Sequence, residues 1–165
     1  MKNLRILLFL FGLLSLSQVQ AQSSGGLFLS PGAEAHGRPF VFSNRGEVEA
    51  ILAFQKAYVA RDVAGMRKYF VPNPTLTNDK NEKIKFSEEV WNSAFADAVS
   101  IAWDIAAIVP IRIKDTDPSS GAMVYSQETI KYKDGRVEKK QLLETFYFNN
   151  DMKISAVDAF SKPLP

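Results

Sequence analysis

The chain has 165 residues with 20 basic and 18 acidic side chains, a formal net charge of +2, a single histidine and no cysteine. The missing cysteine excludes disulfide bonds, thiolate metal sites and cysteine nucleophiles. The lone histidine, His36 in a Gly- and Pro-rich stretch, excludes histidine-based triads and multi-histidine zinc sites. This length suits one domain with one hydrophobic core.

The first 21 residues have the three-part pattern of a cleavable secretory signal peptide. Lys2 and Arg5 give a positive start, residues 6–16 form an apolar run, and a small-x-small pattern ends at Ala21. The run is about 11 residues long, shorter than the roughly 20 residues that a membrane-spanning helix needs. We therefore expect an exported protein, periplasmic or secreted, with no membrane anchor after cleavage.

Cleavage after Ala21 would also change the charge balance. It would remove Lys2 and Arg5 and no acidic residue, which leaves 18 basic and 18 acidic side chains. A domain with no net charge lacks the basic surface that nucleic acids and anionic lipids attract. We therefore expect no nucleic-acid partner.

Residues 22–43 are rich in Gly, Ser and Pro and show no periodicity. This composition is typical of a flexible leader, in which residues 27–29 or 40–42 are candidates for contact with the domain. The folded domain is expected over residues 44–165.

Three helices are expected in the first half of the domain. Asn44 and Glu47 have the spacing of a capping box in front of a helical apolar stripe. Asp62 is a candidate N-cap for a short second helix, which Pro72 ends. A third helix begins at Ser87, where two glutamates in the first turn complement the helix dipole.

After about residue 99 the apolar period changes from 3.6 to 2, which predicts four long strands. These are expected over residues 101–114, 121–133, 137–149 and 153–160, with Asp134-Gly135 as the strongest hairpin signal. Short strands at residues 75–77 and 83–85 precede the third helix. The element order predicts an α+β fold with helices on one face of a curved antiparallel sheet.

Four stretches of the chain resemble the nuclear transport factor 2-like superfamily, which includes SnoaL-type polyketide cyclases and ketosteroid isomerases. They are AFQKAYVARDVAGMRKYF, VPNPTLTND, KYKDGR and LETFYFNNDMKISAVDAF, and the resemblance covers roughly residues 47–162. The resemblance implies a cystatin-like roll, in which a cone-shaped curved antiparallel sheet wraps around three N-terminal helices. It also implies a ligand-sized pocket at the open end of the cone and a homodimer through the outer face of the sheet.

Two positions depart from the pattern of this superfamily. Its members usually have a Gly-Asp step between the first two helices, where this chain has Arg61-Asp62. They usually have Asp-Gly-Lys-Ile in the last hairpin, where residues 151–154 read Asp-Met-Lys-Ile. Asn149 and Asn150 tolerate left-handed backbone and are candidates to replace the missing glycine.

The candidate catalytic residues are carboxylates expected inside the cone, Glu144 and Asp158. Glu144 alternates with Phe146, and Asp158 alternates with Ile154 and Phe160, so both are expected to face inward. Apolar surroundings raise the pKa of a carboxyl group and suit it to proton abstraction. The alternative is a rim carboxylate paired with a lysine, and a one-residue bulge would reverse either orientation.

The candidate ligand-binding residues are aromatic or acidic: Tyr58, Trp91, Trp103, Asp104, Tyr125 and Glu128. An aromatic-lined pocket with few polar groups suits a flat apolar ligand, while aromatic residues at this spacing are also ordinary core residues. We expect no metal site and no cofactor, because phosphate-binding glycine loops and the GxSxG and HExxH motifs are absent from the sequence.

Three functions remain open at this point. The domain binds a small, largely apolar ligand in its cone, or it is an interaction module that dimerises through the outer sheet face. The third possibility is an isomerase- or cyclase-like enzyme with a pocket carboxylate as general base. The lack of a complete catalytic set favours ligand binding.

Overall fold

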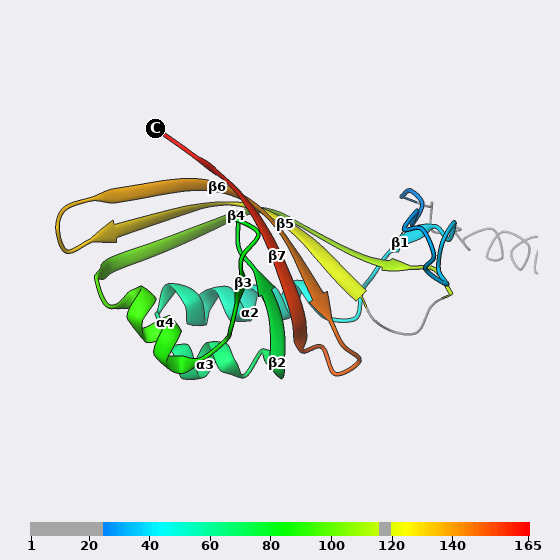
Figure 1. Ribbon diagram of the computed structural model, residues 1–165, viewed down its shortest axis with the longest axis horizontal. Coiled ribbons are helices and arrows are strands. Elements are labelled where there is room, and N and C mark those ends of the chain that lie inside the picture. Colours follow the sequence, from blue (N-terminus) through cyan, green and yellow to red (C-terminus); the bar gives the residue numbers. More distant parts are fainter. Residues whose placement is uncertain (1–24, 116–119) are drawn as a thin grey trace, which may run out of the picture.

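A computed structural model of the chain describes residues 25–115 and 120–165 (Figure 1). The expected signal peptide lies outside these residues. The helices are α2 (Glu47–Val59), α3 (Val63–Arg67) and α4 (Glu88–Phe95), and the strands are β1 (Phe40–Phe42), β2 (Phe70–Thr77), β3 (Lys83–Ile84), β4 (Ala98–Ile113), β5 (Ser120–Tyr132), β6 (Val137–Phe148) and β7 (Ile154–Pro163). Within the described ranges, no helix is long and apolar enough to cross a membrane.

The strands form one curved sheet in the order β1-β4-β5-β6-β7-β2-β3, with the three helices on one side of it (Figure 1). This confirms the expected α+β fold. The four long strands form an antiparallel meander, whereas β2 pairs in parallel with β7. The sequence prediction missed the parallel pair, because β2 and β7 are far apart along the chain and neither strand carries a local signal of the pairing.

Two of the three expected helix caps are confirmed. The Asp62 side chain accepts a hydrogen bond from the backbone N–H of Gly65 at 2.8 Å, and the Ser87 side chain caps α4. The prediction for Asn44 is wrong, because Gly46 is the residue that precedes α2. Glu47 still reaches back as an acid in a capping box does, and accepts from the backbone N–H of Arg45 at 2.9 Å.

The sheet begins inside the segment expected to be a leader. Phe40–Phe42 form β1, which pairs with residues 111–113 of β4. Phe28 donates a backbone hydrogen bond to Arg38 at 2.9 Å, and its ring packs edge-on against Phe40. The contact expected for residues 40–42 is therefore present.

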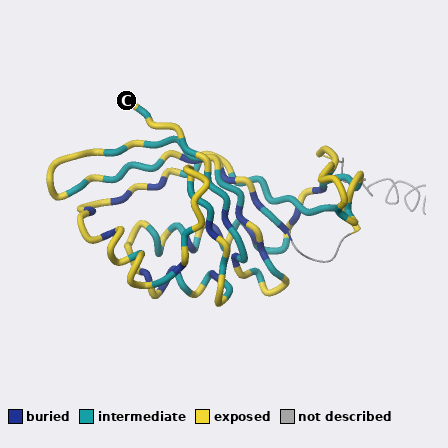
Figure 2. The backbone as a smooth tube through the Cα atoms, viewed as in Figure 1, coloured by how far each residue is buried: buried dark blue, intermediate teal, exposed yellow. Residues whose placement is uncertain are grey.

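The hydrophobic core lies between the helices and the concave face of the sheet, and exposed residues gather at the hairpin ends (Figure 2). Three β-bulges decide which side chains of the meander face this core. Shifts of register leave Val99 and Ala106 unpaired in β4 and Ser155 unpaired in β7. Since an extra residue inverts the alternation beyond it, the bulge at Ser155 turns Val157 rather than Asp158 toward the core.

Candidate functional site

A cavity of about 160 Å³ lies between the helices and the sheet. An apolar cavity of about 150 Å³ holds one benzene molecule, so this one has room for a single ring with a short substituent. Six aromatic side chains line it: Phe54, Tyr58, Phe70, Trp91, Trp103 and Phe146. The other lining residues are aliphatic or uncharged, except for Glu128 and Glu144.

The polar and aromatic groups reach the cavity from both helices and strands. Trp103 on β4 and Glu128 on β5 are direct cross-strand partners, so their side chains share the concave face. The indole Nε1 of Trp103 donates to the Ser126 hydroxyl at 2.8 Å, which fixes that ring. Tyr58 on α2 packs edge-on against Trp103 and against Trp91 on α4, with ring centroids 5.7 and 6.1 Å away.

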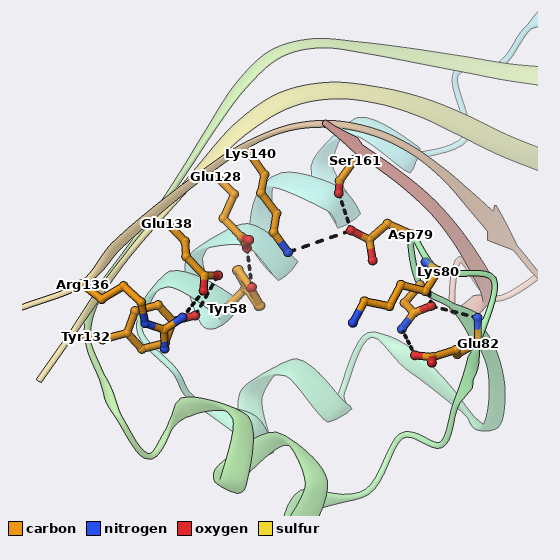
Figure 3. Close-up of polar contacts among 11 residues, drawn as sticks. Tyr58, Asp79, Lys80, Glu82, Glu128, Tyr132, Arg136, Glu138, Lys140 and Ser161 are labelled. Atoms are coloured by element: carbon orange, nitrogen blue, oxygen red, sulfur yellow. Dashed lines mark hydrogen bonds and ion pairs between the residues drawn. The ribbon is translucent and has the colours of Figure 1, made fainter. Parts of the chain in front are cut away.

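Tyr58 and Glu128 form a hydrogen-bonded pair. The Tyr58 hydroxyl donates to Glu128 Oε1 at 2.5 Å (Figure 3). Burial, together with the negative charge of Glu128, holds the pKa of Tyr58 well above its usual range, so this hydroxyl keeps its proton. Burial also raises the pKa of Glu128, while the hydrogen bond from Tyr58 and the charge of Lys140 act in the opposite direction.

Glu144 lines the same cavity without such a partner. Its Oε2 atom is buried, and no group among the described residues hydrogen-bonds to it. Burial and, second, the negative charge of Glu128 raise the pKa of Glu144 to about 8. At neutral pH its side chain is therefore mostly an uncharged carboxylic acid. The indole Nε1 of Trp91 is also buried, and it too has no partner within the described part of the chain.

Polar contacts beside the cavity connect the turn after β2 to strands β6 and β7. Asp79 points toward Lys140 on β6 and Ser161 on β7 (Figure 3). The Lys140 Nζ lies 3.9 Å from Asp79, and the Ser161 hydroxyl donates to the same carboxylate. In the described ranges, no cluster of His, Asp and Glu side chains could hold a metal ion.

The structure therefore brings five of the expected site residues together: Tyr58, Trp91, Trp103, Glu128 and Glu144. Strand alternation keeps two others out. Asp104 follows the inward-facing Trp103 and lies in a shallow exposed hollow beside α2, and Tyr125 lies on the outer face with 45% of its surface exposed. The prediction that Asp104 and Tyr125 line the pocket is therefore wrong.

The inward orientation expected for Asp158 is also wrong. The bulge at Ser155 reverses the alternation, so Asp158 pairs with Thr145 and accepts a hydrogen bond from the Tyr147 hydroxyl on the outer face. Sequence reasoning also missed the cavity residues Leu76, Thr77 and Asn78. They reach the cavity only because β2 lies beside β7, and the pattern of neither strand indicates that pairing.

No protein-family model matches the chain, and no curated protein matches its sequence. Solved structures do match. One is a nuclear transport factor 2-like protein of unknown function from Exiguobacterium sp. 255-15, with 15% identity, a TM-score of 0.56, and coverage of 68% of this chain and 98% of that one. Another is a ketosteroid isomerase-like protein from Erwinia carotovora atroseptica SCRI1043, with 17% identity, a TM-score of 0.53, and coverage of 72% and 98%.

A third match is SalBIII, an epoxide hydrolase/cyclase-like enzyme in pyran ring formation in the polyether salinomycin. It is 12% identical with a TM-score of 0.56, and the match covers 72% of this chain and 92% of that one. At such identities the similarity concerns the fold alone. The chain therefore has the fold of the nuclear transport factor 2-like superfamily, as its four sequence stretches indicate.

Proposed function

We propose that the protein binds a small, largely apolar molecule in the cavity between its helices and its sheet. The observation that carries this proposal is the pair of buried polar atoms, Trp91 Nε1 and Glu144 Oε2, without partners in an otherwise aromatic cavity. Leaving such an atom unpaired costs about 1–3 kcal/mol, and ordinary protein cores pair their polar atoms and fill their space. A ligand that covers the rings and pairs these atoms removes both costs. The signal-peptide pattern supports a site of action outside the cytoplasm.

We expect single-ring compounds to change the intrinsic fluorescence of the protein, because both of its tryptophans, Trp91 and Trp103, line the cavity. The measurement is a titration with a panel of neutral, cationic and anionic benzene derivatives. Ala159→Phe should abolish the response, since Ala159 lines the cavity and a ring there fills it. Ala156→Phe, on the outer face of the same strand, is the matched control. A panel that leaves the fluorescence unchanged at millimolar concentration contradicts the proposal.

General acid–base catalysis is a second candidate function for the same cavity. A carboxyl group with a pKa of about 8 can take up and release a proton near neutral pH, and Glu144 is such a group. The similarity of fold to SalBIII, an epoxide hydrolase/cyclase-like enzyme, adds support by analogy. Turnover of a bound compound that Glu144→Gln abolishes, while binding persists, would favour catalysis over binding alone.

We also propose that two copies of the chain associate through the outer face of the sheet. Tyr125, Leu143 and Phe160 are direct neighbours across β5, β6 and β7, and 45%, 47% and 65% of their surfaces are exposed. A contiguous apolar patch of this kind is typical of an interaction surface. A chain with equal numbers of acids and bases after signal cleavage meets its own copy without net repulsion.

Leu143→Glu is expected to convert such a dimer into a monomer, because it places two charges in the apolar contact of a two-fold interface. Analytical ultracentrifugation measures the change in mass. Leu52→Glu, on the exposed side of α2, is the matched control and should leave the dimer intact. A wild-type chain that stays monomeric at 100 µM, on the order of a weak dimer's dissociation constant, contradicts the proposal.

A further inference from the structure

We propose that the ligand of the cavity is a compact organic cation, an amine or quaternary ammonium group attached to an apolar body. This inference rests on the proposed ligand-binding function and names the chemical class of the ligand. Three observations support it: the sign of the charges around the cavity, the unpaired state of Glu144, and the arrangement of the aromatic rings.

The charged residues that line the cavity are both acidic. Glu128 and Glu144 line it, and no described Lys, Arg or His does. The nearby lysine, Lys140, is the cross-strand partner of Glu128. Its Nζ points toward Asp79 beside the cavity and lies 3.9 Å from that carboxylate (Figure 3). An anionic ligand would therefore meet the negative charge of Glu128 in a poorly solvated space, whereas a cation would be attracted to Glu128 and, once it ionises, to Glu144.

Glu144 is the carboxyl group that has no positively charged partner to offset its charge when it ionises. The titratable groups that face it are Glu128 on β5 and Tyr58 on α2, and neither supplies positive charge. The cavity lining from β2, the turn after it, β7 and α4, which includes Thr77, Asn78, Ala159 and Trp91, has no titratable side chain. A cation beside Oε2 would supply the opposite charge that this buried carboxylate lacks.

Six aromatic rings line the cavity together with the two carboxyl groups. The planes of Trp91 and Trp103 lie at 87° and 75° to the plane of Tyr58, at centroid distances of 6.1 and 5.7 Å. Aromatic rings that line a binding site attract a positive group through their π-faces, as in the aromatic cages that bind quaternary ammonium, and all three of these rings line the cavity. The unpaired Trp91 Nε1–H adds a place for one acceptor oxygen on the same ligand.

A permanent cation should bind the ionised form of Glu144, and this gives the inference a pH signature. Because the pKa of Glu144 is about 8, roughly 1% of the protein has this group ionised at pH 6 and about half at pH 8. Apparent affinity scales with the binding-competent fraction. The affinity for a quaternary ammonium ion should therefore rise roughly 50-fold from pH 6 to pH 8 and level off above it.

The test compares three single-ring probes whose charge does not change with pH. Phenyltrimethylammonium is the cation, tert-butylbenzene is its uncharged counterpart of the same shape, and benzenesulfonate is the anion. Tryptophan fluorescence titrations from pH 6 to pH 9 measure their affinities for the wild-type protein. We expect the cation to bind at least about tenfold more tightly than tert-butylbenzene at pH 8, which corresponds to a favourable charge interaction of modest size. Benzenesulfonate should not bind.

Glu144→Gln should remove the pH dependence and most of the preference for the cation, while Glu82→Gln, an exposed change in the turn after β2, should preserve both. The wild-type pH profile tests the inference even if the Glu144 variant folds poorly. Equal binding of tert-butylbenzene and the cation, or affinity that falls as pH rises, would overturn the inference and leave the proposed function standing. If none of the three probes binds at millimolar concentration, the proposed function fails as well.

Discussion

Phe146→Ala is expected to lower the free energy of unfolding by about 3–5 kcal/mol, the usual cost of removing a large buried aromatic side chain. Only 1% of the surface of Phe146 is exposed. Its ring contacts Phe54 on α2 and Trp103 on β4, with centroids 6.1 and 6.3 Å away. The change therefore removes a contact between the helix layer and the sheet, and it leaves a void that rigid neighbours cannot fill. Urea unfolding followed by far-UV circular dichroism measures the loss.

Phe160→Ala is the matched control, because it makes the same chemical change on the neighbouring strand at a site where 65% of the ring is exposed. In dilute protein, where association through the outer face is negligible, its cost should stay within about 0.5 kcal/mol. Similar losses for the two variants would show that the core does not lie on the concave face of the sheet.

The sequence is most informative about elements whose signals are local. Alternating apolar residues and the Asp134-Gly135 turn predict the long meander strands to within a few residues, and Asp62 and Ser87 predict two helix starts. Each of these signals acts over a few neighbouring residues. The parallel pairing of β2 with β7 has no such signal, because β3, α4 and the first three strands of the meander lie between these two strands along the chain. The cavity residues on β2 were missed for the same reason.

The prediction for Glu144 is correct where strand alternation is unbroken, whereas the predictions for Asp104 and Tyr125 are wrong because alternation with Trp103 and Glu128 puts them on the other face. Glu144 lies in a regular stretch of β6 and faces the cavity as expected. Asp158 lies beyond a bulge, and one extra residue is enough to move it to the other face. Bulges depend on how two strands fit their twist and register, so the pattern of one strand does not reveal them.

The two departures from the superfamily pattern keep the backbone that glycine would favour. Arg61 and Met152 stand where members of the superfamily usually have glycine, and both have left-handed φ angles, 59° and 57°. Asn149, expected to relieve the missing glycine, has its side chain bonded to the backbone N–H groups of Asp151 and Lys153. That side chain holds the turn, while Met152 itself takes the left-handed conformation, which is costly for a residue with a Cβ atom.

The protein is expected to lose stability as pH rises from about 4.5 to about 8, and Glu144→Gln is expected to remove most of that loss. Glu144 titrates near its ordinary value of 4.5 in the unfolded chain and at about 8 in the folded one. Between these values the folded state keeps a proton that the unfolded state has released, so the unfolding free energy falls with rising pH. At about 1.4 kcal/mol per pH unit the loss over this window is roughly 3–5 kcal/mol. Urea unfolding at a series of pH values measures it.

Other carboxyl groups can be separated from this effect by the direction in which their pKa shifts. Burial raises the pKa of Glu47, but hydrogen bonds from the Ser43 hydroxyl and the Arg45 backbone N–H outweigh it and lower the pKa, so its contribution to stability is lost only as pH falls below about 4.5. The raised pKa of Glu128 acts in the same direction as that of Glu144, so Glu128→Gln should remove a further part of the slope.

Glu34→Gln, in an exposed turn, is the control and should leave the wild-type slope unchanged. A wild-type slope near zero between pH 5 and pH 8 would contradict the burial of an unpaired Glu144. Because ionised Glu144 is costly only while it lacks a counter-charge, a saturating quaternary ammonium ligand should restore much of the lost stability at pH 8.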